Sequence, residues 1–270
     1  MRPSLTPAQA AAYREVGFLY PIDALRRDEA ARFRSEYERV AVLLGGSPKA
    51  VRLTQIHRFY GWAWELSSHP AVLDAVEAVI GSDIMVWSAQ VFPKAARDPG
   101  YISMHQDATY WGLQGGEVTT AWIALTPSTK ENGCMRLLPG SHRSAVLPHS
   151  DTFAADNLLT RGQVVQAQYD ERDVVDVELE PGQMSLHHVR AIHGSHRNRS
   201  DGPRIGFAIR YMTPEVRPLR PGQRAALVRG SDRSGNWVLH DGPPSYPTLR
   251  SAVRAHQAEA ERFVAALTND

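Results

Sequence analysis

The sequence predicts a mainly β fold with flanking helices, and three observations lead to this prediction. Residues 83–213 are mostly short apolar runs separated by Gly, Pro, Asn and Asp, a pattern typical of a sandwich, jelly roll or barrel. Helical patterns lie before and after this region. No internal repeat interrupts the chain. At 270 residues the length allows one large domain, so we expect residues 1–270 to form a single domain, with helices around one β core.

The expected helices are placed by capping signals and apolar spacing. Thr6 offers a capping hydroxyl and Pro7 suits the first helical position, so a helix should continue from there to Val16 and end at Gly17. Further helices are expected over residues 25–44, 71–80 and 248–267.

The expected strands are short. They are predicted over residues 18–21, 84–92, 102–106, 118–125, 134–138, 174–179, 183–186 and 204–211, with a loop over residues 226–237. Residues 141–173 form a long polar insertion, and long insertions in compact domains often cover active sites. We expect this insertion, or the aromatic region at residues 47–64, to exclude water from a site.

Composition narrows the function classes. A net charge of +1 gives no overall field that would attract nucleic acid or a membrane, so we expect neither as a partner. The expected state of assembly is a monomer or a homodimer. The single cysteine, Cys134, excludes an intramolecular disulfide and fits a reducing compartment. The N-terminus has no apolar signal core, and no stretch of 18 uncharged apolar residues occurs, so a cytoplasmic location is expected.

His105 and Asp107 are the first candidates for metal ligands. In the strand expected over residues 102–106, positions two apart point to the same side, so an imidazole and a carboxylate would converge. The pair offers two thirds of the 2-His-1-carboxylate triad that holds non-haem Fe(II) and leaves coordination positions open. Such a pair is common by chance, so a second histidine has to support it.

The second histidine must come from the eleven in the chain. His193 is the best candidate because it ends an apolar pair and precedes Gly194 and Ser195, where glycine permits close backbone approach. Arg204 follows eleven positions later at the start of an apolar strand. A buried arginine needs a partner, and its planar fork suits a carboxylate. That partner is either a structural acid or an acidic cosubstrate lying between Arg204 and the metal.

These residues together resemble the phytanoyl-CoA dioxygenase family, whose members are Fe(II)- and 2-oxoglutarate-dependent oxygenases with a double-stranded β-helix (cupin-like jelly-roll) core. The resemblance covers residues 83–213 and extends loosely into the N-terminal helices. Its further landmarks are Trp122-Ile123-Ala124-Leu125, Asn132-Gly133-Cys134-Met135, Leu138-Pro139-Gly140-Ser141-His142 and Pro181-Gly182-Gln183.

The resemblance implies a role for each matching residue. Fe(II) would be bound by His105, Asp107 and His193, and the distal carboxylate of 2-oxoglutarate by Arg204 and Ser195. Gln90 and Trp122 would face the cosubstrate. Tyr110 and Trp111 would line the substrate pocket, and His188 is a further candidate there.

The implied reaction consumes O₂ and 2-oxoglutarate and yields succinate and CO₂. Members of the wider family with Gly or Ala at the carboxylate position bind chloride there, so Asp107 favours hydroxylation over halogenation. The expected substrate is a small molecule of secondary or amino-acid metabolism.

Several alternatives remain open. His187 and His188 straddle a strand, so one should face inward, where it contacts substrate or forms a hydrogen bond within the core. Arg210 could bind an anionic substrate, but a structural ion pair is favoured. The competing functions are a cupin-like metal enzyme that does not use 2-oxoglutarate and a non-catalytic β-barrel binding module.

Overall fold

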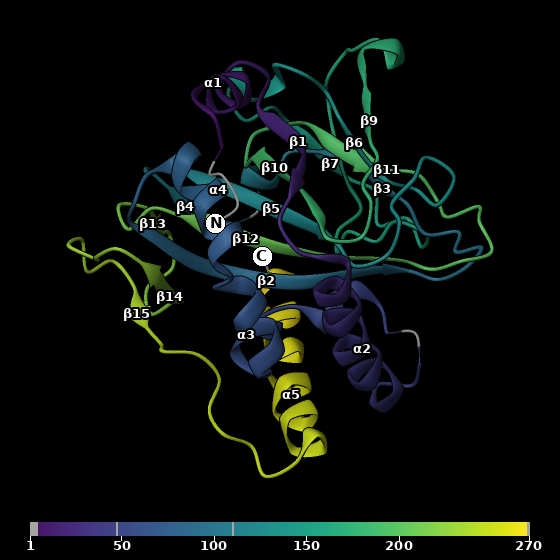
Figure 1. Cartoon of the computed structure of the whole chain (residues 1–270). Coiled ribbons are helices and arrows are strands. Elements are labelled where there is room, and N and C mark those ends of the chain that lie inside the picture. The colour runs from purple at the N-terminus through teal and green to yellow at the C-terminus, as the bar shows by residue number, and fades with distance from the viewer. Residues whose placement is uncertain (1–4, 47, 110, 269–270) are drawn as a thin grey trace.

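The computed structural model describes residues 5–46, 48–109 and 111–268, and side chains as far as residue 262 (Figure 1). The α-helices are α1 (Pro7–Val16), α2 (Arg27–Leu43), α3 (Gly61–Ser67), α4 (Pro70–Ile80) and α5 (Leu249–Thr268). The strands are β1 (Phe18–Asp23), β2 (Ile84–Lys94), β3 (Ile102–His105), β4 (Leu113–Gln114), β5 (Val118–Ala124), β6 (Met135–Leu137), β7 (His149–Asp151), β8 (Gln163–Val165), β9 (Val175–Val177), β10 (Gln183–His188), β11 (His193–Ser195), β12 (Arg204–Met212), β13 (Arg217–Pro218), β14 (Arg224–Arg229) and β15 (Val238–Leu239). Short 3₁₀ helices are η1 (Ala50–Leu53), η2 (Ile56–Arg58), η3 (Asp107–Thr109), η4 (Ser141–Arg143) and η5 (Glu171–Asp173).

Two antiparallel sheets form the core. The larger has the order β1-β10-β5-β12-β2-β14-β15, in which only the pairing of β14 with β15 is parallel, and the smaller has the order β3-β11-β6-β9. Neither sheet closes on itself. The predicted mainly β fold with a double-stranded β-helix core is confirmed.

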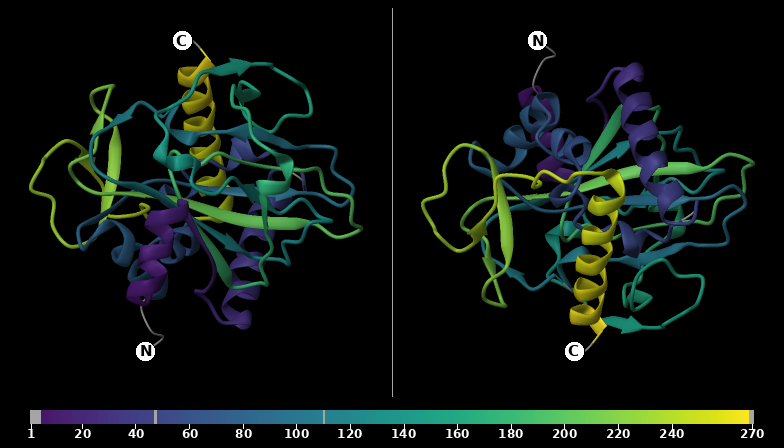
Figure 2. Two further views of the ribbon diagram at one scale, coloured as in Figure 1. Left: turned by 90° about the horizontal axis from the view of Figure 1, so that it is seen from above. Right: turned by 90° about the horizontal axis from the view of Figure 1, so that it is seen from below.

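The helices cover the outer face of the larger sheet. Alternation along β12 sends Ile205, Phe207 and Ile209 into a core cluster shared with α2, α3, α4 and α5. Figure 1 shows α2, α3 and α5 together on one side of this sheet, and the view from below in Figure 2 shows α2 and α5 in front of the strands. The alternate residues of β12 therefore face the other way, toward the smaller sheet.

Three parts of the chain differ from expectation. The strand predicted over residues 102–106 ends at His105, and η3 begins at Asp107. Residues 226–237 were expected to be a loop, but Arg224–Arg229 forms β14 and pairs with β2. The insertion at residues 141–173 contains the paired strands β7 and β8. Among the helices in the described ranges, none is long and apolar enough to cross a bilayer.

Candidate metal centre

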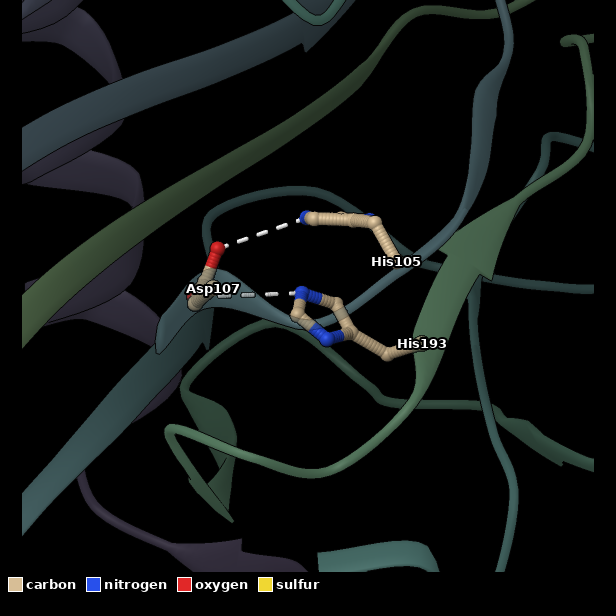
Figure 3. A group of neighbouring side chains, drawn as sticks. All are labelled: His105, Asp107 and His193. Carbon is tan, nitrogen blue, oxygen red and sulfur yellow. Dashed lines mark ion pairs between the residues drawn. The ribbon is translucent and has the colours of Figure 1, made fainter. Parts of the chain in front are cut away.

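His105, Asp107 and His193 converge on one point. His105 ends β3, His193 begins β11, and the two are directly paired across these antiparallel strands. The His105 Nε2 atom lies 3.3 Å from Asp107 Oδ1, and His193 Nε2 lies 3.9 Å from Asp107 Oδ2 (Figure 3). One ligand atom from each residue lies within 4.8 Å of the other two. Two nitrogen donors and one carboxylate at this spacing fit a facial triad for a divalent metal.

The backbone turn after His105, rather than strand alternation, brings Asp107 to this point. The side chain of Gln106 is buried, donates to the Arg190 carbonyl at 2.8 Å and accepts from the Leu147 amide at 2.8 Å. The backbone N–H of Gln106 donates to His149 Nε2 at 3.0 Å. The expected convergence is therefore observed, but the geometry that we predicted for it is wrong.

Two backbone carbonyls orient the imidazole rings. His105 Nδ1 lies 2.9 Å from the Ser103 carbonyl, and His193 Nδ1 lies 3.0 Å from the Ala191 carbonyl. A carbonyl can only accept, so each Nδ1 carries the proton and each Nε2 is left to bind a metal at the shared focus.

The protonation states at the focus also suit a metal. Burial, together with the neighbouring His105, lowers the pKa of His193 to about 4. Burial alone would raise the pKa of Asp107, but His193 and His105 hold it well below its usual range. At neutral pH the focus thus offers a neutral His193 and an ionised carboxylate, as metal coordination requires.

The focus opens into a cavity of about 740 Å³. This volume lies within the range of small-molecule sites. Both segments expected to exclude water contribute walls, including Gln55 and Arg58 from the first and Leu158 to Arg161 from the second. A third wall runs from Leu219 to Arg224.

The inner face of the larger sheet forms the floor of the cavity in cross-strand rows. One row, here called the Arg210 row, consists of Ser88, Arg210, Thr120 and His187. The next row contains Gln90, Ala208 and Trp122. Arg204 lies further along β12, opposite Lys94 of β2.

Arg204 is a buried cation without a partner. Its side chain is 2% exposed, and its Nε and Nη2 atoms make no hydrogen bond within the described residues. The guanidinium lies 5.2 Å from the ring centre of Trp122. A side chain at Gly206 would collide with the Trp122 indole, so glycine there allows the indole to lie against β12. No ion pair joins Arg204 to a described carboxylate, which leaves its fork available to an acidic ligand in the cavity.

Ser195 lies at the same end of the cavity as Arg204. Its Oγ accepts a hydrogen bond of 2.8 Å from Lys94 Nζ, which also donates to the His196 carbonyl. Lys94 is fully buried and does not line the cavity. Burial, followed by the charge of Arg204, lowers the pKa of Lys94 to about 6.

The other predicted residues divide into three groups. Gln90, Trp122 and Trp111 line the cavity, whereas Tyr110 lies outside the described residues. His188 was the wrong choice of the neighbouring pair. Strand alternation on β10 directs His187 into the cavity, 4.7 Å from the His193 ring, and places His188 against His142.

Arg210 also differs from expectation. We favoured a structural ion pair, but Arg210 makes none with the described residues and instead lines the cavity. Its position could have been read from the sequence, because residues 204 and 210 share a face of any strand that contains both.

Comparison with known proteins agrees with this geometry. Residues 13–206 match the family described as phytanoyl-CoA dioxygenase (PhyH). A probable phytanoyl-CoA dioxygenase of Caenorhabditis elegans is 29% identical over 161 residues, which are 57% of this chain and 51% of the worm protein, so the match spans about half of that relative. The peroxisomal phytanoyl-CoA dioxygenase of Rattus norvegicus is 24% identical over 77% of this chain and 68% of its own length.

Among solved structures, the non-heme monooxygenase ThoJ in its apo form has a TM-score of 0.82 and 33% identity over 97% of this chain and 99% of its own. CytC3, solved with Fe(II) and alpha-ketoglutarate, has a TM-score of 0.66 and 20% identity over 92% of this chain and 95% of its own, and shows a shared fold. On the match over residues 13–206, the chain belongs to the phytanoyl-CoA dioxygenase family.

Proposed function

We propose that the protein is an Fe(II)- and 2-oxoglutarate-dependent oxygenase that hydroxylates a small molecule, in secondary or amino-acid metabolism. One observation carries the proposal. A converged His105, Asp107 and His193 faces a cavity that also contains the buried, unpartnered guanidinium of Arg204. A metal enzyme without 2-oxoglutarate would leave that charge buried at a cost and without use, and a binding module would need no open triad.

The residues at the metal centre have separate roles. His105, Asp107 and His193 would hold the metal, and the Ser103 and Ala191 carbonyls fix the two rings. Fe(II) with 2-oxoglutarate supplies the activation of O₂ and yields succinate and CO₂.

The cosubstrate is anchored at the other end of the cavity. Arg204 binds its distal carboxylate through charge-assisted hydrogen bonds, helped by the Ser195 hydroxyl. Trp122 packs against the Arg204 guanidinium and restricts its movement. The walls at residues 51–58 and 158–163 exclude water. The retained carboxylate of Asp107 leaves no vacancy for a halide, which supports hydroxylation.

Metal removal tests the proposed function. We expect the purified protein to release succinate from 2-oxoglutarate in the presence of Fe(II) and O₂, and a chelator to abolish this release. Calorimetry under anaerobic conditions should show 2-oxoglutarate binding to the Fe(II)-loaded protein and much weaker binding to the metal-free protein. Equal succinate release with and without the chelator would contradict the proposal.

Lys94 provides a pH test of the cosubstrate site. Because its pKa is lowered to about 6, its amine is mostly neutral at neutral pH. A carboxylate beside Ser195 and Arg204 favours the ammonium form, so the pKa rises on binding. We therefore expect 2-oxoglutarate binding to take up as much as one proton near neutral pH, and its affinity to fall as the pH rises above about 6.

Calorimetry in buffers of different ionisation enthalpy measures this uptake. Lys94→Met, which keeps a long apolar side chain, should lose the uptake and the associated pH dependence. Proton uptake that is unchanged in Lys94→Met would assign the proton to another group.

A further inference from the structure

A second buried cation, Arg210, faces the cavity. It is 9% exposed, and its only hydrogen bond to a described residue is from Nη1 to Gln90 Oε1, at 3.2 Å. Its Nε atom is buried without a hydrogen-bond partner. Asp107 is the acid that raises the pKa of Arg210, but burial is the larger influence and lowers it. These two residues do not form an ion pair, so the structure leaves the charge of Arg210 without a partner.

The neighbours of Arg210 hold its guanidinium in one place. Gln90 donates its Nε2 to the Ala50 carbonyl at 2.9 Å, which turns its oxygen toward Arg210. The guanidinium carbon lies 5.4 Å from the ring centres of both Phe92 and Trp111. Aromatic faces restrict an arginine and tolerate its charge without neutralising it. A guanidinium that is fixed in place and whose charge is not neutralised can bind an anion in the cavity.

Other polar atoms without partners lie in the same row. Thr120 is directly opposite Arg210 on β5, and His187 is opposite Thr120 on β10. Thr120 Oγ1 and His187 Nδ1 are buried and make no hydrogen bond with the described residues. Both residues line the cavity. Three adjacent residues with unsatisfied polar atoms at one place carry a large desolvation cost, which a bound polar ligand would remove.

An anion bound by the Arg210 row would be a different one from the carboxylate assigned to Arg204. The two arginines are six residues apart on β12, which separates their Cα atoms by roughly 20 Å. Trp122 and Ala208 lie between them in the row of Gln90. The Arg210 row lies at the metal end, because the His187 ring is 4.7 Å from that of His193. A second anion at the metal end points to the molecule that is oxidised.

Two other arginines of the cavity already have an acidic partner. Arg58 pairs with Glu259 at 2.7 Å, and Arg161 pairs with Asp151 at 2.7 Å. Apolar surface lies near Arg210: the rings of Trp87 and Trp111 are 5.0 Å apart, and Leu158 and Leu219 also line the cavity.

We propose that Arg210, assisted by the Thr120 hydroxyl, binds a carboxylate of the substrate, and that the substrate is a small carboxylic acid with an apolar body. Gln90 acts as a positioning residue that sets the Arg210 fork. This inference rests on the proposed function, since it assigns the substrate class for the same site. The proposal also places the oxidised carbon of the substrate near its carboxylate, because the Arg210 row adjoins the metal ligands.

Calorimetry with a matched pair of probes tests the proposal. Protein loaded with Ni(II) and 2-oxoglutarate, which does not turn over, is titrated with indole-3-propionate and with indole-3-propionamide. The two probes share a body and differ in charge. We expect the acid to bind about 10- to 100-fold more tightly than the amide, the range for a charge-assisted hydrogen bond. Arg210→Gln should remove this preference, and Arg210→Lys should retain part of it.

Arg224→Gln is the control. It removes another cavity cation, an exposed one on β14, and should keep the preference for the acid. Equal affinity of the wild-type protein for acid and amide would overturn the proposal, as would a preference that survives Arg210→Gln. Loss of 2-oxoglutarate binding in Arg210→Gln would assign Arg210 to the cosubstrate instead and also overturn it. Failure of the proposed function is distinct, because wild-type protein would then bind no 2-oxoglutarate when loaded with metal.

Discussion

Asp107→Ala is expected to abolish metal-dependent succinate release and to weaken Fe(II) binding by more than about 100-fold. Residues that only support metal ligands typically contribute 10- to 100-fold in affinity, so loss of a ligand should cost more. Among the described residues, Asp107 supplies the only carboxylate at the focus, and without it the metal would be held by the nitrogen atoms of His105 and His193 alone. The fold should survive, because Asp107 begins a 3₁₀ turn that the Gln106 side chain holds independently.

Two measurements check this result. Metal content after dialysis against a fixed concentration of Fe(II) reports binding, and succinate release reports turnover. Asp201→Ala removes an exposed carboxylate that pairs with Arg97, and it should match the wild type in both measurements. Normal iron content in folded Asp107→Ala would remove Asp107 from the set of ligands.

Arg204→Met is expected to raise the KM for 2-oxoglutarate by about 30-fold to several thousand-fold. This range corresponds to about 2–5 kcal/mol, the usual cost of truncating one partner of a buried charged pair. The same change should stabilise the free protein. Arg204 is buried without a hydrogen-bond partner among the described residues, and burial lowers its pKa to about 10, so an apolar side chain of similar length removes a desolvation cost.

Thermal unfolding separates the two effects. Without 2-oxoglutarate the Tm of Arg204→Met should exceed that of the wild type by at least about 2 °C. When 2-oxoglutarate is added to metal-loaded protein, the Tm of the wild type should rise by more than that of the variant at the same concentration.

Arg229→Met is the matched control for this experiment, because Arg229 pairs with Asp74 at 2.8 Å and Glu77 at 2.6 Å. It should lower the Tm and leave the KM unchanged. A normal KM in Arg204→Met would show that Arg204 does not bind the cosubstrate.

The spacing of polar residues around apolar runs predicted much of the site. His193, Ser195 and Arg204 could be chosen because each lies beside or within a short apolar strand, and the structure brings all three to one cavity with His105 and Asp107. The choice between His187 and His188 could not be made. It depends on which face of β10 is turned inward, and a polar pair at the end of a strand carries no periodic signal.

The fold, too, could be predicted in part from the sequence. The long strands β2, β5 and β12 were predicted because their apolar residues are numerous. β14 was missed because Arg224 and Arg229 at its ends give it the composition of a surface segment, and its place at β2 is set by long-range pairing. Likewise, the carbonyls of Ser103 and Ala191 that orient the metal histidines depend on backbone geometry, which composition does not encode.

Gln106, the residue between the first two metal ligands, joins the insertion at residues 141–173 to the turn that carries Asp107. Its side chain holds the Leu147 amide and the Arg190 carbonyl, and its backbone holds His149, so three segments of the chain meet at one amide. A displacement of the insertion by an entering substrate would pull on the peptide that joins His105 to Asp107. The position of the insertion and the geometry of the turn that carries Asp107 are therefore coupled through the hydrogen bonds of this one residue.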